Sequence, residues 1–464
     1  MKNTNIFLII VLMLVSFLNA NSMLDNLRIN GFVSQGYIYS QENDYLVKGS
    51  QGGSSELNEL GFTLSKQLSP KLRVGFQLLS RDYGELGNNE TKLDWAFADY
   101  RWKDYLGFRF GKVKTPLGLY NEGRDVDMLR PTVFLPQSVY DEAYRSYLVA
   151  YQGVGLYGSL PLMDYGDLEY NGFLGNMNLD KEDLPMRDLL DLANGLLSSL
   201  SPDQTTYIDM LCEDFHGASI FYNSPYYFRV GYSFFNFNGN AYTPNINIQS
   251  NIDLYGVFAD PTDPTTYTPI QAPIKSYGNK PFELEVKIPN RRAISFEFQY
   301  ENFTLATEYL QETLQVNTDI NFPVNYYLAA DSAIFNTDHV KFDELYDRDD
   351  EAFYVMASYT FFEKYTLSGI YDHIELKKQK QLALDANNKP FLADMLPSVP
   401  NKLDHRTDIG LGIKYDVNFN WTIKAEYHAV DGIYRAYSDL LEGVEEDTLE
   451  KDWSYMLTKV SFNF

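Results

Sequence analysis

Apolar and polar residues alternate with a period of two over much of the chain. Leu60, Phe62 and Leu64 alternate with small or polar residues, and the alternation resumes at Leu72 after a short turn that contains Pro70. Two such segments around a tight turn are typical of a β-hairpin. The unit recurs along the chain, so the pattern predicts an all-β fold. Short turns are expected at 67–71, 103–105, 162–166, 223–226, 301–302, 362–364 and 416–420.

Long polar stretches separate these hairpins. Short turns that alternate with long loops are typical of transmembrane barrels of the outer membrane, whose turns are periplasmic and whose loops lie outside. Seven hairpins predict about 14 strands, and the segments 27–39 and 453–464 raise the expected count to about 16. An even count lets the first and last strands pair antiparallel and close the barrel. The expected loops are 40–56, 115–150, 178–215, 238–291, 314–350, 376–404 and 430–452.

A secreted β-sandwich would show the same alternation. Two features favour the transmembrane antiparallel β-barrel. Aromatic residues gather on one face of the strands near the short turns, as in an interfacial girdle. The opposite face carries small and charged residues, whereas the core of a sandwich excludes charge. The expected girdle residues are Tyr105, Tyr300, Phe303, Tyr359, Phe361, Tyr365, Tyr415 and Trp421.

Both ends of the chain carry export features. Lys2, the apolar run 6–18 and Ala20 are typical of a secretory signal peptide, so we expect residues 1–20 to be removed and residues 21–464 to form one barrel domain. An uncleaved anchor helix is the alternative, but the run is short for a membrane span. The last strand ends on Phe464, which resembles the terminal signal that the barrel-assembly machinery reads in bacterial outer-membrane proteins.

Composition excludes several classes of function. The chain has 38 Lys and Arg against 63 Asp and Glu, a net charge of −25, which argues against nucleic acid as a partner. The single cysteine, Cys212, rules out a disulfide framework, and we expect it beside a loop helix within 189–211. The five histidines never approach metal-ligand spacing, so no metal or other cofactor is expected.

No catalytic motif stands out, and the sequence predicts that the protein is not an enzyme. There is no GxSxG motif, no P-loop and no pair of histidines at ligand spacing. His428 beside Glu426 is the one catalytic candidate, and a polar residue on the lumen wall is the better interpretation of it.

The segment 108–157 carries the most distinctive motif, which consists of 111–114 (GKVK), 116–122 (PLGLYNE), 130–131 (RP), 135–138 (LPQS) and 153–154 (GV). This pattern resembles Gram-negative outer-membrane porins, nearest the phosphate-selective porin O/P superfamily. The resemblance implies a homotrimeric channel of 16 strands whose third long outer loop folds into the lumen. We expect the loop 115–150 to be this loop and its apolar residues to pack on the inner wall. Those residues are Leu117, Leu119, Met128, Leu129, Val133, Phe134 and Leu135.

Charged residues in and around this loop are the expected pore constriction. They are Lys112, Lys114, Glu122, Arg124, Asp125, Asp127, Arg130 and Arg145. Lys112 and Lys114 have outward parity on their strand, so they reach the pore only if a bulge or loop begins there.

Strand parity predicts a second set of charged residues on the lumen wall. The set is Arg73, Arg81, Arg109, Arg229, Lys414, Lys424, Lys459, Asp94, Glu169, Glu297, Glu308, Asp408 and Glu426. Selectivity would depend on how these charges line the narrowest section. Their mixed signs differ from the dense ladder of arginines expected of a phosphate-selective porin.

Acidic residues concentrate in three outer loops. Segment 180–214 has a net charge of −7, segment 338–351 of −5 and segment 430–452 of −6. Solvation of exposed loops accounts for this charge, and bridging to lipopolysaccharide by divalent cations or steering of cations is the alternative.

The sequence therefore predicts a porin in the outer membrane of a Gram-negative bacterium. It would form a water-filled channel for passive diffusion of small hydrophilic solutes or ions, with lipid and lipopolysaccharide around it. A barrel-embedded enzyme and an adhesin or scaffold acting through the acidic loops are the competing functions.

Overall fold

Side chains alternate along each strand between an exposed and a buried face. In β20 (Trp421–Asp431), Trp421, Ile423 and Tyr427 are exposed, while Thr422 and Lys424 between them are buried. Successive side chains of a strand point to opposite faces of the sheet. The apolar side of this wall therefore faces outward, and the polar side faces inward.

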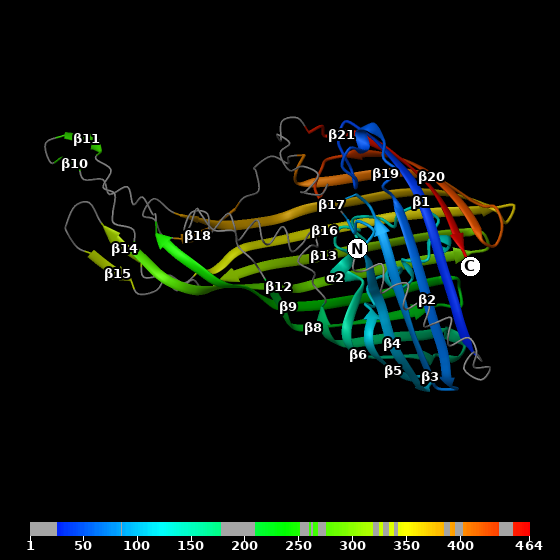
Figure 1. Ribbon diagram of the computed structural model, residues 1–464. Helices are drawn as coiled ribbons and strands as arrows, with labels where there is room; N and C mark the ends of the chain where they lie inside the picture. The colour runs from blue at the N-terminus through cyan, green and yellow to red at the C-terminus, as the bar shows by residue number, and fades with distance from the viewer. Residues whose placement is uncertain are drawn as a thin grey trace.

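The computed structural model joins sixteen such strands into a closed antiparallel barrel (Figure 1), as the sequence predicts. Each strand pairs with the next one in the ring, and pairing of Val33 in the first strand with Phe462 in the last closes it. The strands are β1 (Leu27–Gln41), β2 (Asn58–Ser69), β3 (Leu72–Asp82), β4 (Thr91–Lys103), β5 (Leu106–Lys114), β6 (Ala150–Pro161), β7 (Asp167–Met177), β8 (Asp209–Asn223), β9 (Phe228–Ser250), β12 (Lys275–Tyr300), β13 (Phe303–Thr318), β16 (Phe342–Phe361), β17 (Tyr365–Leu384), β19 (His405–Asp416), β20 and β21 (Asp452–Asn463).

The structure describes residues 26–84, 86–177, 209–250, 259–260, 263–267, 275–318, 324–327, 334–337, 342–384, 390–394, 402–435 and 449–464. The expected signal peptide at 1–20 lies outside these residues. Smaller elements lie in the connections or beside the ring: β10 (Ala259–Asp260), β11 (Asp263–Tyr267), β14 (Val324–Tyr327), β15 (Ile334–Thr337), β18 (Pro390–Asp394), η1 (Ser50–Gly52), η2 (Asn121–Gly123), η3 (Asp127–Leu129), η4 (Met163–Tyr165) and α2 (Arg145–Leu148). Among the described residues, no helix is long and apolar enough to cross a membrane.

An apolar belt surrounds the outside of the barrel. On β13 the outward residues nearest the turn are Phe303, Leu305, Thr307 and Tyr309, and the next outward residue is Gln311. Across neighbouring strands the polar residues just beyond the belt bond to one another. Arg292 Nε donates to Gln311 Oε1 at 2.8 Å, and Gln311 Nε2 donates to Glu351 Oε1 at 2.9 Å.

Aromatic rings mark the turn-side edge of this belt, as the sequence predicts for the girdle. Tyr300, Tyr359 and Trp421 are exposed there, and Tyr365 stacks between Phe361 and Tyr415. Such aromatic edges are typical of membrane interfaces.

Several strands on one side of the barrel extend far past the belt (Figure 1). β12 has 26 residues and β9 has 23, more than twice the roughly 9–11 that a membrane span needs. The loop boundaries expected at 238–291, 314–350 and 376–404 are therefore wrong, since parts of these segments are strand. The sequence of 275–284 is mostly polar, so it lacks the apolar face that identifies strands inside the belt.

Two further expectations need correction. Cys212 lies in β8, so the end of the expected loop helix, 209–211, is strand, and the rest of that segment lies outside the described residues. The inner wall is also less polar than predicted. Inward aromatic residues Phe173, Phe215 and Phe235 of β7 to β9 belong to a buried apolar cluster, because apolar residues of the loop after β5 pack onto them.

Candidate pore constriction

The loop 115–149 leaves the barrel wall at the end of β5. Gly111 adopts a φ of +123°, a conformation that favours glycine, and Lys112 remains on the outward side with its Nζ donating to Leu93 O at 2.6 Å. Two residues later, Lys114 is buried and points inward. Of these two lysines, Lys114 forms an ion pair with the loop residue Asp125.

The first cluster of the loop joins both of its ends to β4. Lys114 Nζ lies 2.6 Å from Asp94 Oδ2, and Arg145 of α2 lies 2.9 Å from Asp94 Oδ1. Both cations also pair with Asp125. Burial alone would raise the pKa of Asp125, but Lys114 and Arg145 lower it well below its usual range. The two acids and two bases are nearly inaccessible to water, which fits a role in holding the loop.

A second cluster joins the loop to β3. Arg124 lies 2.7 Å from Glu142 Oε1, and Arg81 lies 2.6 Å from Glu142 Oε2. Burial alone would raise the pKa of Glu142, but the guanidinium groups of Arg124 and Arg81 outweigh burial and lower it to about 2. Arg124 also donates to Tyr140 O at 2.8 Å, which fixes the return of the loop.

A third cluster holds η3 against the seam where the barrel closes. Asp127 lies 3.1 Å from Lys424, 3.2 Å from Lys459 and 2.8 Å from Arg130. Lys459 in turn lies 2.5 Å from Glu59 of β2. Burial would raise the pKa of Asp127, but Lys424 and Lys459 lower it well below its usual range. Ser461 Oγ donates to the same carboxylate at 2.7 Å.

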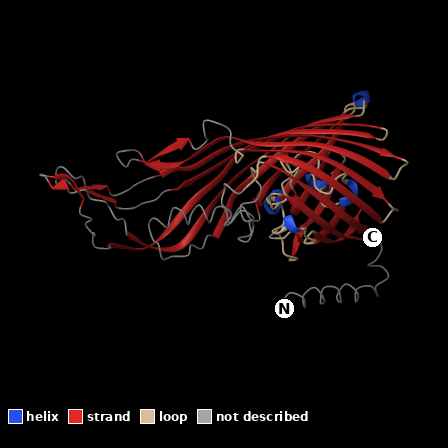
Figure 2. Ribbon diagram, turned by 90° about the horizontal axis from the view of Figure 1, so that it is seen from above, coloured by secondary structure: helices blue, strands red, loops and turns tan. Residues whose placement is uncertain are grey.

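On the opposite side of the ring, Glu308 of β13 receives the loop. Its carboxylate accepts from Leu119 N at 2.9 Å and from Tyr354 of β16 at 2.8 Å, and also from the Tyr140 hydroxyl. On β17, Asp372 Oδ2 accepts from Ser138 N at 3.0 Å. Because β4 and β16 lie on opposite sides of the ring, the loop crosses the whole lumen, and Figure 2 shows short helices enclosed by the strands. This is the arrangement that the sequence predicts for the third long loop.

The apolar residues of the loop divide between two clusters and a cavity. Leu117 and Leu135 pack with the aromatic inner wall of β6 to β9. Val133 and Phe134 pack with Trp453 in a second cluster at the loop end of the barrel. Leu129 remains 75% exposed and borders the cavity described next.

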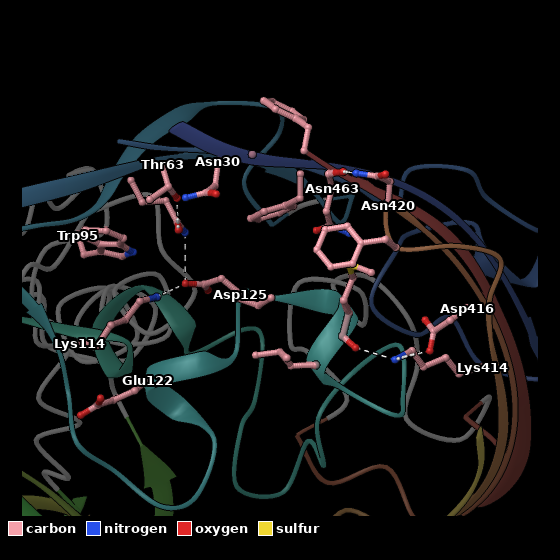
Figure 3. Close-up of a pocket in the computed structure, with 18 of the residues that line it drawn as sticks. Asn30, Thr63, Trp95, Lys114, Glu122, Asp125, Lys414, Asp416, Asn420 and Asn463 are labelled. Carbon is pink, nitrogen blue, oxygen red and sulfur yellow. Dashed lines mark hydrogen bonds and ion pairs between the residues drawn. The ribbon is translucent and has the colours of Figure 1, made fainter. Parts of the chain in front are cut away.

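A cavity of about 1080 Å³ lies between the loop and the short turns (Figure 3). Several charged side chains that border it are exposed, among them Arg73 at 47% and Glu122 at 47%. Arg109 lies 3.7 Å from Glu122, and Lys414 Nζ donates to Met128 O at 2.6 Å. The residues that line the cavity are Asn30, Gly31, Phe32, Thr63, Arg73, Gln77, Trp95, Phe97, Arg109, Val113, Lys114, Glu122, Asp125, Val126, Met128, Leu129, Glu363, Lys364, Lys414, Asp416, Asn418, Phe419, Asn420, Asn463 and Phe464.

The other residues expected on the lumen wall also point inward. Arg229 lies 3.0 Å from Glu169, and Glu297 accepts from the Tyr120 hydroxyl at 3.0 Å. Glu426 accepts from Val133 N at 2.5 Å. Most of these side chains contact the loop or one another.

Sequence reasoning did not select Glu59, Glu142 or Asp372. The position of Glu59 and Asp372 on the inward face of their strands is the one feature of the sequence that points to them. Nothing in the local sequence identifies their partners. Glu142 lies in the loop, where no periodic pattern exists.

His428 is buried among charged and aromatic side chains. Its Nδ1 lies 2.7 Å from Asp408 and its Nε2 lies 3.4 Å from Glu426, and its ring stacks on Tyr455. The exposed fraction of His428 is 5%. The arrangement resembles a structural charge cluster rather than a reactive site.

No protein-family model matches the sequence, and no curated protein matches it. Among solved structures, the OmpF complex with daunomycin from Salmonella typhi has 14% identity, covers 94% of this chain and 97% of its own, and gives a TM-score of 0.49. Outer-membrane expressed OmpT of Vibrio cholerae has 10% identity, coverage of 94% and 97%, and a TM-score of 0.47. An anion-selective porin from Comamonas acidovorans has 8% identity, coverage of 94% and 99%, and a TM-score of 0.46. At these identities the likeness concerns the fold alone.

Proposed function

We propose that the protein is an outer-membrane porin through which small hydrophilic solutes diffuse passively. The observation that carries this proposal is the loop 115–149, which crosses the lumen of a closed barrel with an apolar outer belt. A closed sheet satisfies its backbone hydrogen bonds in lipid, and about 16 strands enclose more space than their own side chains fill. A single loop fixed across that space restricts its width without covalent chemistry.

The exposed charges at the cavity set the proposed selectivity. Arg73 and Glu122 are accessible to water, whereas Arg124, Asp127 and Arg130 are buried in ion pairs. A solute can approach Arg73 and Glu122 directly, although Arg73 pairs with Asp99 and Glu122 lies 3.7 Å from Arg109. Both signs are accessible, which supports passage of neutral and weakly charged solutes over selection for phosphate.

The proposed function requires export of the chain and its assembly in the outer membrane. Residues 1–20 would direct the chain to secretion, and Phe464 would be read by the barrel-assembly machinery. Phe464 N donates to Gly31 O at 3.0 Å, so the terminal residue also contributes to closing the barrel. A homotrimer surrounded by lipid and lipopolysaccharide is the proposed assembly.

Reconstitution in planar lipid bilayers tests the function. The purified protein is expected to give stepwise increases in current whose size grows with salt concentration. Heat-denatured protein at the same concentration is the control. Folded protein that inserts in vesicles and yet leaves the bilayer current unchanged would show that it is not a channel.

A further inference from the structure

The cavity below the loop has an aromatic surface on one side (Figure 3). Trp95 and Phe97 are two residues apart on β4, so both point inward, and their rings stack with centroids 5.0 Å apart. The guanidinium of Arg73 lies over the Phe97 ring, 5.3 Å from its centroid. Pockets that bind small molecules combine such apolar surface with a few placed polar groups.

Apolar side chains of the loop border the same cavity. Val126 is 41% exposed and Leu129 is 75% exposed, although both belong to a segment that is otherwise tightly packed. Exposed apolar surface inside a polar lumen is unfavourable unless a ligand covers it. The cavity therefore suits a solute that itself has an apolar face.

Charged groups around the cavity are largely paired. Arg73 lies 3.2 Å from Asp99, and Lys414 lies 3.2 Å from Asp416. Such pairs offer strong hydrogen-bond donors and acceptors but little net field. They favour a neutral solute with several hydroxyl groups over a free ion.

Amide side chains add hydrogen-bonding capacity at the turn end of the cavity. Asn420 Nδ2 donates to Asn463 O at 2.7 Å, which fixes the two residues beside each other. Asn463 Nδ2 has no hydrogen-bond partner among the described residues, although it is shielded from bulk water. A buried amide without a partner is costly, and a ligand hydroxyl would remove that cost.

We propose that this cavity is a binding site for neutral sugars in the pyranose form, an inference that rests on the proposed channel function. One face of the ring, rich in C–H groups, lies on Trp95 and Phe97. Ring hydroxyls accept from Asn463 Nδ2 and exchange hydrogen bonds with the ion pair of Arg73 and Asp99. Bound sugar would slow ions in the lumen.

Calorimetric titration of the full chain in detergent with maltose tests the proposal. The Trp95→Leu variant is expected to bind maltose about fivefold more weakly, since it loses the stacking surface. Trp95→Phe keeps an aromatic face and is expected to bind within about twofold of the original chain. Trp102→Leu, on the exposed outer side of the same strand, is the matched control and leaves affinity unchanged.

Asn463→Ala provides a second variant and is expected to weaken maltose binding several-fold while the barrel stays folded. Binding of benzoate or glycine that is tighter than binding of maltose would overturn the assignment to neutral sugars. The assignment would also fail if maltose bound Trp95→Leu and the original chain equally. Stepwise bilayer currents without maltose binding would overturn this inference alone, whereas missing currents would overturn the channel function.

Discussion

At the scale of single residues, the loop is held by carboxylates that each meet more than one cation. Asp127 contacts Lys424, Lys459 and Arg130, and all four side chains are buried. Removing charges from water is costly, and buried pairs repay that cost only when their geometry and hydrogen bonds are good. Removal of one partner is therefore expected to cost more free energy than the intact cluster contributes to stability.

Asp127→Asn tests this cluster. It leaves the buried Lys424 and Lys459 without a full counter-charge, so we expect the free energy of unfolding to fall by about 3–5 kcal/mol. Unfolding by urea of protein in lipid vesicles measures the change. Glu90→Gln, which alters an exposed carboxylate 4.0 Å from Lys92, is the control and is expected to change stability by less than about 0.5 kcal/mol. Equal stability of the two variants would show that the cluster does not hold the loop.

Acid should weaken the contact of Glu142 with Arg124 and Arg81. The pKa of Glu142 in the folded chain is about 2, below the ordinary 4.5. Its ionised form therefore stabilises the fold above about pH 4.5, and this stabilisation, about 3 kcal/mol, is lost as the pH falls toward 2. We expect the stability difference between the original chain and Glu142→Gln to be largest at pH 7 and to shrink below pH 4. A difference that is constant from pH 7 to pH 2 would contradict the ion-pair assignment.

Strand parity predicts an inward face for the charged wall residues, but it fails where a strand is irregular, since Asp94 and its neighbour Trp95 both point inward. Parity cannot identify the partners of these residues. Lys424, for example, donates a hydrogen bond to the main-chain oxygen of Asp127, which lies 297 positions away in the sequence. Parity also cannot show that Arg124 and Arg130 are buried, since loop residues have no period. The sequence therefore predicts which charged residues the loop contains. Which of them are buried and which are exposed depends on the fold.

At the scale of elements, the turns and the strands within the apolar belt were predictable from alternation. β19 and β20, for example, have an alternating apolar face from the turn to the edge of the belt. β9 and β12 extend further, and the extension of β12 escaped prediction because the sequence of 275–284 is mostly polar. The aromatic inner wall was not predicted either, because Phe215 and Phe235 lie on the face of their strands that carries polar residues in the rest of the barrel.

β5 depends on glycine at position 111, shortly before the loop begins. A Cβ at this position would lie 2.3 Å from Ala96 O, and the φ of +123° is unfavourable for other residues. Gly111→Ala is expected to lower the free energy of unfolding by about 1–3 kcal/mol. Gly52→Ala, where no atom lies within 4 Å of the added Cβ, is the control for the same chemical change. Equal effects of the two substitutions on urea unfolding would contradict the requirement for glycine in β5.

At the scale of the whole molecule, the outward apolar belt places the barrel in a membrane. Leu411, which is 68% exposed, lies in the middle of this belt on β19. Leu411→Lys is expected to destabilise the protein in lipid vesicles by about 2–4 kcal/mol, because a charge at this depth loses its hydration. Thr91→Lys on the loop side of the belt is the matched control, with an expected cost of about 0–1 kcal/mol. A similar cost at both positions would contradict the placement of the belt.

The buried ion pairs of the loop 115–149 fix it across a lumen that would be wide without the loop. Single-channel conductance in planar bilayers, compared between the full chain and a variant in which two glycines replace residues 121–140, tests this claim most directly. We expect the variant to conduct several-fold more, because the deletion removes η2, η3 and the clusters centred on Asp125 and Asp127. Unchanged conductance in a variant whose circular dichroism shows an intact barrel would contradict the assignment of this loop as the constriction.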